Sequence, residues 1–196
     1  LKPATEKAVN IGTVFEPNYE ALNGLKPDLI IVGSRAAKKV DELKNIATTI
    51  DVTTPKEVNT LQGGLNNIEN YGKLFNKEAE AAKLKAELET LIAETKEAVK
   101  GKGNGLIVLV NGGKMSAFGP VGRLGWVHSA LDIPEAKFEV NTKGASHGTP
   151  ISFEYLQKVN PDWLFVLDRT AAIGEEGKTA QEVLDNELVH QTKAWK

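Results

Sequence analysis

Two arginines of this chain stand just beyond short apolar runs, where a side chain that binds an acidic ligand would stand in an α/β protein. Arg35 lies after LIIV at 29–32, and Arg169 lies after WLFVL at 163–167. Such runs are typical of strands that are buried on both faces, as in parallel sheets. Ligands of open α/β sheets bind at the carboxyl ends of the strands. A permanently charged guanidinium is therefore expected at this edge in each of two similar lobes.

Both arginines occupy the last position of an internal repeat. Residues 18–35 align with residues 152–169 at a constant offset of 134 positions and without a gap. The identical pairs are Glu20/Glu154, Leu22/Leu156, Pro27/Pro161, Asp28/Asp162, Val32/Val166 and Arg35/Arg169. Each copy predicts a short helix capped by Asn18 or Ser152, a proline that ends it, and a buried strand. The alternative is that a common α/β unit occurs twice by chance and that the arginines are surface or capping residues.

The remaining predicted helices and strands indicate an α/β chain that is interrupted by two successive helices. Thr54 and Pro55 have the residue types of an N-cap and a first helical position, so a helix is expected to start there. The other expected elements are strands at 11–15, 48–52, 106–110, 115–118 and 163–167, and helices at 35–47, 77–100, 124–131 and 179–190. The long helical connection is the expected domain boundary, and one continuous sheet crossed by two helices is the alternative.

Known catalytic motifs are absent from the sequence. It has no cysteine, which excludes thiolate catalysis, iron–sulfur clusters and Cys zinc sites. The three histidines, His128, His147 and His190, form no HExxH motif, and NGGK at 111–114 lacks the spacing of a phosphate loop. A net charge of −2 argues against a nucleic-acid partner, and no apolar stretch approaches the roughly 18 residues of a membrane span. The sequence therefore favours a binding protein over an enzyme.

Four stretches of the chain are distinctive: KPDLIIVGSR (26–35), SAFGPVGRLG (116–125), SHGTPISFEYL (146–156) and NPDWLFVLDR (160–169). They resemble the periplasmic iron–siderophore binding proteins that serve ABC importers, above all those that take ferric catecholates of the enterobactin and petrobactin type. The resemblance implies the helical-backbone type of periplasmic-binding-protein fold, with a parallel sheet in each of two lobes and the ligand in the cleft between them. It assigns residues 1–55 to the remainder of the N-terminal lobe, 56–75 to an interlobe helix and 76–196 to an incomplete C-terminal lobe.

The resemblance also implies roles for particular residues. The basic residues of the family's cleft correspond to Arg35 in the first lobe and to Arg123 and Arg169 in the second. A histidine of some members corresponds to His147, which could complete the coordination of siderophore-bound iron. The acidic residues that dock the lobes to the permease correspond to Glu20 and Glu154, although carboxylates also simply favour helix N-termini.

A ferric tris-catecholate is a bulky trianion with aromatic edges, which suits arginine. The guanidinium keeps its proton, donates in a planar fork to catecholate oxygens and stacks on aromatic rings. Ferric iron is expected only as part of the siderophore complex, with no intrinsic cofactor. Haem, cobalamin, ferric citrate or a ferric hydroxamate are alternative ligands of the same fold, and a cytosolic enzyme of two α/β lobes is the alternative from another class.

The resemblance further implies a chain truncated at both ends. Family members normally have more strands before this start, and a closing strand and helix after this end. The chain opens with LKPATEKAVNIGT, without an initiator Met or a signal peptide, and lacks the C-terminal tyrosine that ligates iron in some members. The complete protein is expected to be a monomer, either periplasmic or lipid-anchored on the outer face of the cytoplasmic membrane, with an ABC permease as its partner.

Overall fold

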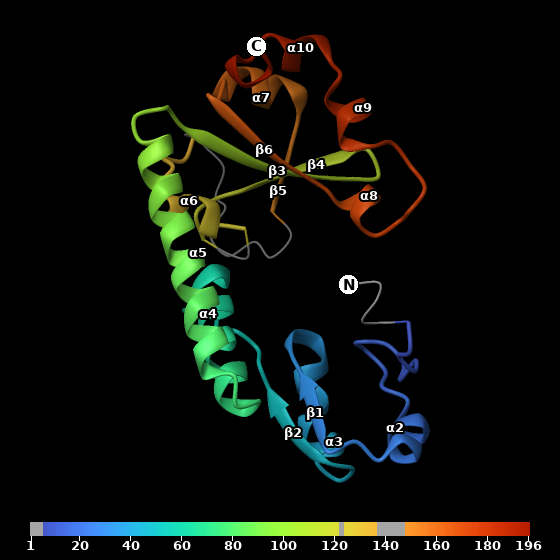
Figure 1. The fold of residues 1–196 in the computed structure, drawn as a ribbon. Helices are drawn as coiled ribbons and strands as arrows, with labels where there is room; N and C mark the ends of the chain where they lie inside the picture. The colour runs from blue at the N-terminus through green and yellow to red at the C-terminus, as the bar shows by residue number, and fades with distance from the viewer. Residues whose placement is uncertain (1–5, 122–123, 137–147) are drawn as a thin grey trace. The chain divides into compact units, whose positions relative to one another are not determined.

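A computed structural model describes residues 6–121, 124–136 and 148–196 (Figure 1). The chain divides into two compact units, Leu1–Pro55 and Lys56–Lys196. The assignment of lobes and of an interlobe helix to the predicted ranges stays a prediction.

The first unit is built around two parallel strands. Strand β1 pairs with β2 in parallel, so that Ile31 lies opposite Ile50. Its buried core consists of Leu22, Ile30, Val32 and Leu43. The elements are α2 (Tyr19–Leu25), β1 (Leu29–Val32), η1 (Ser34–Lys39), α3 (Val40–Leu43) and β2 (Thr48–Asp51). The helix predicted at 35–47 is thus shorter and divided, because Lys39 leaves helical geometry with φ −102° and ψ 5°.

The strand predicted at 11–15 is wrong, because the chain forms a turn there. Gly12 has φ +96°, a conformation that favours glycine, and pairs with Pro17 in an isolated bridge. The backbone N–H of Thr13 donates to the carbonyl of Glu16 at 2.9 Å. These short-range bonds curl the segment back on itself, so its apolar residues cannot extend into a sheet.

The second unit begins with two helices, α4 (Thr60–Leu74) and α5 (Glu78–Val99). The predicted helix start at Thr54 is wrong. Asn59 is the N-cap instead, and its side chain accepts from the backbone N–H of Gln62 at 2.9 Å. The helix predicted at 77–100 is confirmed. Among the described residues, no helix has the length and apolar character needed to cross a membrane.

Gly72 sets the close approach of α4 to α5. A Cβ added there would lie 2.5 Å from the Cβ of Ala81, whereas a Cβ on Gly64 in the same helix would meet nothing within 4 Å. We expect Gly72→Ala to lower the free energy of unfolding by about 1–3 kcal/mol through overpacking. The matched control Gly64→Ala should raise it by about 0.5–1 kcal/mol, because alanine favours the helix. Urea unfolding followed by circular dichroism checks both, and equal effects of the two variants would contradict the prediction.

A four-stranded sheet forms the centre of the second unit, in the order β5-β4-β3-β6. Its strands are β3 (Gly105–Asn111), β4 (Lys114–Phe118), β5 (Thr149–Ile151) and β6 (Trp163–Asp168). Parallel pairing is confirmed for β3 with β6, as it is for β1 with β2. The second sheet is nevertheless mixed, because β4 runs antiparallel to both β3 and β5. Gly112 and Gly113, both at positive φ, reverse the chain between β3 and β4.

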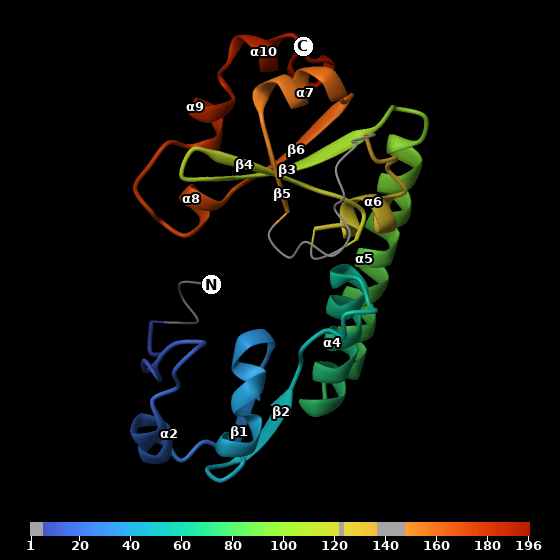
Figure 2. The ribbon, with the colours of Figure 1, turned by 180° about the vertical axis from the view of Figure 1, so that it is seen from behind.

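Strand β3 is buried on both faces and connects two apolar clusters. Leu106, Val108 and Val110 pack with residues of α7, α9 and α10, whereas Ile107 and Leu109 pack towards α6. This alternation follows from the two-residue period of a strand. Figures 1 and 2 show α7 and α10 on one side of the sheet and α6 on the other. The helices are α6 (Trp126–Leu131), α7 (Phe153–Val159), α8 (Arg169–Ala172), α9 (Ala180–Leu184), α10 (Glu187–His190) and the short η2 (Lys193–Trp195).

The internal repeat has the same local structure in both copies. The side chains of Asn18 and Ser152 cap α2 and α7, accepting from the backbone N–H three residues later at 3.0 and 3.2 Å. Both helices have seven residues and end on a left-handed residue, Lys26 or Asn160, each with φ 47°. A proline and a strand then follow in each copy, as predicted. The predicted burial of these strands on both faces is wrong: Ile31 of β1 is 41% exposed, and Trp163, Val166 and Leu167 of β6 are also exposed.

Candidate functional site

Arg35 follows the carboxyl end of β1 in the first turn of η1, and this turn is hydrogen-bonded to Thr53, just after the end of β2. The backbone N–H of Ser34, which has φ +55°, donates to Oγ1 of Thr53 at 2.7 Å. That hydroxyl donates in turn to the carboxylate of Asp51, the last residue of β2. The guanidinium of Arg35 is exposed, and its Cζ lies 4.8 Å from the centre of the Phe15 ring. The turn therefore presents a cation beside an aromatic face.

Arg169 begins α8, directly after the carboxyl end of β6. Because β3 and β6 are parallel, Asn111 ends its strand at the same edge, and its Oδ1 accepts from Nη1 of Arg169 at 2.9 Å. The Arg169 side chain stays 42% exposed, with the carboxylate of Glu175 at 3.8 Å. Asn111 was missed by the sequence analysis. Its place at the end of the apolar run 106–110 is the same signal that singled out the arginines.

The backbone around Arg169 is held by its two neighbours. Asp168 caps α8 by accepting from the N–H of Ala171 at 2.9 Å, and its other oxygen accepts from the N–H of Ala180 at 2.6 Å. The hydroxyl of buried Thr170 accepts from the N–H of Gly112 at 3.0 Å. These bonds fix the start of α8, so the guanidinium projects from a rigid base.

The backbone hydrogen bonds from Ala171 and Ala180 lower the pKa of the Asp168 carboxyl. A carboxyl with a lowered folded-state pKa contributes stability above its unfolded pKa and loses it as pH falls through the folded value. We therefore expect Asp168→Asn to be less stable than the wild type at pH 7, and the difference to shrink below about pH 4, the ordinary range of an aspartate. Urea unfolding at pH 7 and pH 3 checks this. A difference that is constant with pH would show that the charge of Asp168 contributes nothing.

The two predicted docking carboxylates occupy matching places. Glu20 and Glu154 are exposed in the first turns of α2 and α7. The hydroxyl of Ser152 and the backbone at the start of α7 lower the pKa of Glu154. Both positions suit a carboxylate for local reasons, since helix N-termini favour negative charge. Their predicted contact with a permease stays a prediction.

Arg123 and His147 lie outside the described residues, so the structure does not place them. His128 is buried, at 5% exposure, with its Nδ1 3.0 Å from the carbonyl oxygen of Ile133. His190 is paired with Asp185 and stacks on Trp195. In the part of the chain that the structure describes, no cluster of three or more His, Cys, Asp or Glu residues could hold a metal ion.

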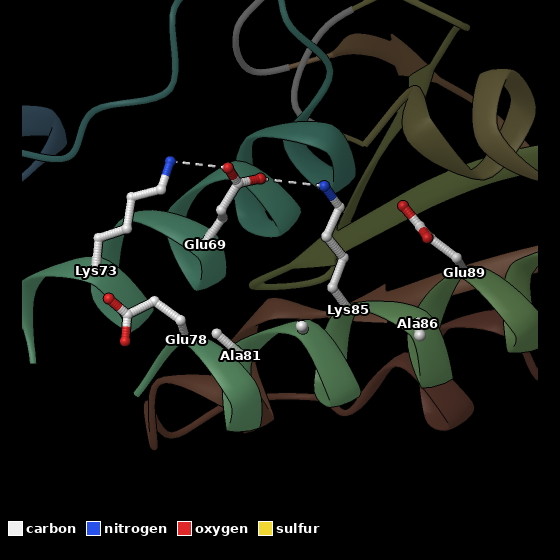
Figure 3. Close-up of a pocket in the computed structure, with 8 residues that line it drawn as sticks. Glu69, Lys73, Glu78, Ala81, Lys85, Ala86 and Glu89 are labelled. Carbon is white, nitrogen blue, oxygen red and sulfur yellow. Dashed lines mark hydrogen bonds and ion pairs between the residues drawn. The ribbon is translucent and has the colours of Figure 1, made fainter. Parts of the chain in front are cut away.

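A groove of about 370 Å³ lies between α4 and α5 (Figure 3). Its floor is formed by alanines of α5, and Glu69 bridges Lys73 at 3.0 Å and Lys85 at 3.2 Å across it. Of the predicted site residues that the structure describes, none lines this groove. Its lysine charges are already paired, so it offers no free cation to an acidic ligand. The strand edges that carry Arg35 and Arg169 are therefore the better candidates.

The α/β elements, the repeated units and the strand-edge arginines are the features that the resemblance to a binding-protein family predicts, and comparison with known proteins identifies the family. The chain belongs to the periplasmic binding protein family, which it matches over residues 1–196. Among curated relatives, it is 38% identical over 194 residues to the petrobactin-binding protein YclQ of Bacillus subtilis, covering 97% of this chain and 59% of the relative. It is 31% identical over 194 residues to the ferric-anguibactin-binding protein FatB of Vibrio anguillarum, covering 95% of this chain and 59% of the relative.

A solved structure supports the same grouping. The periplasmic catecholate-siderophore binding protein VctP of Vibrio cholerae superposes with a TM-score of 0.88 at 29% identity, covering 99% of this chain and 69% of that one. The resemblance to siderophore-binding proteins is thus confirmed. The chain spans about 59% of the length of the two curated relatives.

Proposed function

We propose that the protein is an extracytoplasmic solute-binding protein that captures a ferric siderophore and delivers it to an ABC permease. The observation that carries this proposal is the cationic strand edge of the second unit, where Asn111 orients the exposed guanidinium of Arg169 at 2.9 Å. The names of the relatives support the ligand class, since they include petrobactin-, anguibactin- and catecholate-siderophore binders. In this role the protein binds and releases its ligand without chemical conversion, so it is not an enzyme.

The number and chemistry of the arginines in the sequence favour a catecholate among the ferric siderophores. The chain has three arginines, Arg35, Arg123 and Arg169, which match the charge of a tris-catecholate trianion. Uncharged hydroxamates would leave guanidinium groups without counter-charge, and a desolvated unpaired charge is costly. Ferric iron is then cargo within the siderophore, and His147 is the proposed residue that contacts it if the siderophore leaves a coordination position open. The ligand's predicted place between two lobes stays a prediction.

Tryptophan fluorescence tests the ligand class. Trp126, Trp163 and Trp195 report on binding, so titration with a hexadentate ferric tris-catecholate should quench emission with saturation in the micromolar range or below. Ferric citrate, a ferric hydroxamate and haem serve as competitors, and the iron-free catecholate is the control. If the protein in its natural length is quenched by a competitor but not by the ferric tris-catecholate, the catecholate assignment is wrong.

Glu20 and Glu154 are proposed to dock the protein to its permease, with the protein periplasmic or lipid-anchored at the outer face of the cytoplasmic membrane. Replacing both with alanine should abolish siderophore-dependent iron uptake by cells while leaving the affinity for the ferric siderophore within twofold of the wild type. Uptake of radioactive iron checks the first result and the fluorescence titration checks the second. The control is Glu87→Ala with Glu97→Ala, which removes two exposed carboxylates from α5. Normal uptake by the Glu20/Glu154 variant would contradict the docking role.

A further inference from the structure

Phe15 is a large apolar side chain held out in solvent. Its side chain is 61% exposed. It lies in the turn that the chain forms where a strand was predicted at 11–15. An aromatic side chain on a loop offers a flat apolar surface, and binding residues are often placed on loops that a rigid scaffold supports.

The turn that carries Phe15 is closed by several hydrogen bonds within it. Oδ1 of Asn10 accepts from the N–H of Gly12 at 2.8 Å, and Oγ1 of Thr13 accepts from the N–H groups of Phe15 and Glu16 at 3.2 and 3.0 Å. The N–H of Asn18 donates to the carbonyl of Ile11 at 2.8 Å, which closes the base of the turn. The exposure of Phe15 is therefore built into the backbone of the turn.

The ring lies against the only guanidinium of the first unit. The Cζ of Arg35 is 4.8 Å from the ring centre, within the range of a cation–π contact. The first unit thus offers a flat apolar surface and a fixed positive charge side by side. A catecholate has matching parts, since it joins an aromatic ring to anionic oxygens. Aromatic rings prefer offset-stacked or edge-to-face contact with one another.

We propose that Phe15 is a specificity-determining residue that packs against an aromatic ring of the ligand while Arg35 binds the anionic oxygens of the same ligand. This inference rests on the proposed function, which it narrows to ligands that carry aromatic rings. A competing role for Phe15 is to hold Arg35 in place without touching the ligand. The two roles predict different effects of replacing Phe15 on the affinity for an anion that has the same charge as the catecholate complex but no aromatic rings.

The experiment compares two ferric trianions, a hexadentate tris-catecholate and the ring-free tris-oxalate, on the wild type and on Phe15→Leu. Leucine keeps an apolar side chain but removes the ring. We expect Phe15→Leu to weaken tris-catecholate binding about three- to tenfold, the range that measured aromatic contacts support, and to leave tris-oxalate binding unchanged. Phe15→Tyr should restore catecholate binding. The control Val14→Ala alters the neighbouring exposed residue of the same turn and should change neither affinity.

Each outcome decides between the roles. Equal weakening of both complexes by Phe15→Leu would overturn the stacking contact in favour of the positioning role. Tight catecholate binding by Phe15→Leu would overturn the inference while leaving the proposed function intact. If the wild type binds neither trianion, the proposed function fails and the inference fails with it. Thermal unfolding of each variant confirms that the fold is kept, which the exposure of Phe15 leads us to expect.

Discussion

Replacing Arg123 and Arg169 together with alanine should weaken the binding of a ferric tris-catecholate a hundredfold or more. Each guanidinium is proposed to donate charge-assisted hydrogen bonds to catecholate oxygens, and such bonds contribute about 1.5–3 kcal/mol each. A hundredfold loss of affinity corresponds to about 3 kcal/mol, which is the loss of one such bond from each arginine at the lower value of about 1.5 kcal/mol. The fluorescence titration measures the two dissociation constants.

The structure sharpens this expectation for Arg169. Its backbone is fixed by Asp168 and Thr170, and its guanidinium is oriented by Asn111. Little side-chain entropy is then lost on binding, which strengthens the contact. Arg169→Lys keeps the charge but removes the planar fork, so we expect an affinity between those of the wild type and Arg169→Ala.

The matched control for Arg169→Ala is Lys83→Ala, which likewise removes one exposed positive charge, in this case from α5. It should leave the affinity unchanged, because an exposed cation that does not contact the ligand is largely screened by salt. Unchanged affinity in the Arg123/Arg169 double variant would remove these residues from the site. A loss in Lys83→Ala equal to that in Arg169→Ala would show that only the overall charge of the protein matters.

Leu156→Ala should lower the free energy of unfolding of the second unit by about 2–5 kcal/mol. Leu156 is 1% exposed and belongs to the cluster that joins α7 to Leu106, Val108 and Val110 of β3. Removing its isobutyl group loses transfer free energy and leaves a cavity in a closely packed core. Urea unfolding followed by circular dichroism measures the change.

The control is Leu91→Ala on α5, where the side chain is 57% exposed. The chemical change is the same, but little apolar surface leaves the core, so the effect should stay within about 0.5 kcal/mol. A loss below about 1 kcal/mol for Leu156→Ala would mean that the neighbouring helices collapse into the space. Leu22, its counterpart in the repeat, is buried in the smaller core of the first unit.

The local features of the repeat were predictable from the sequence. Asn18 and Ser152 cap their helices, Pro27 and Pro161 follow them, and Arg35 and Arg169 stand after the strands. Each of these features depends on backbone chemistry that acts within a few residues. A side-chain oxygen reaches an N–H three residues away, and proline lacks the N–H that a helix interior needs.

The start of α4 and the structure of residues 11–15 were harder to predict, because nearby residues in each segment favour different structures. Thr54 and Asn59 both have residue types that suit an N-cap, and in the structure the helix begins after Asn59. The apolar residues of 11–15 indicate a strand by type, but Gly12 and Thr13 bend the segment into a turn. Hydrogen bonds within the turn replace the neighbouring strand that an extended segment would need.

The candidate site shows most clearly which features are local in the sequence and which depend on tertiary structure. The sequence by itself determined that Arg35 and Arg169 follow apolar strands, because apolar runs and their ends are local patterns. Only the tertiary structure decided that Asn111 orients Arg169 from 58 residues away and that Phe15 lies against Arg35. Those neighbours depend on the parallel register of β3 with β6 and on the closure of the 12–17 turn. Residue types alone do not predict which segments make these contacts.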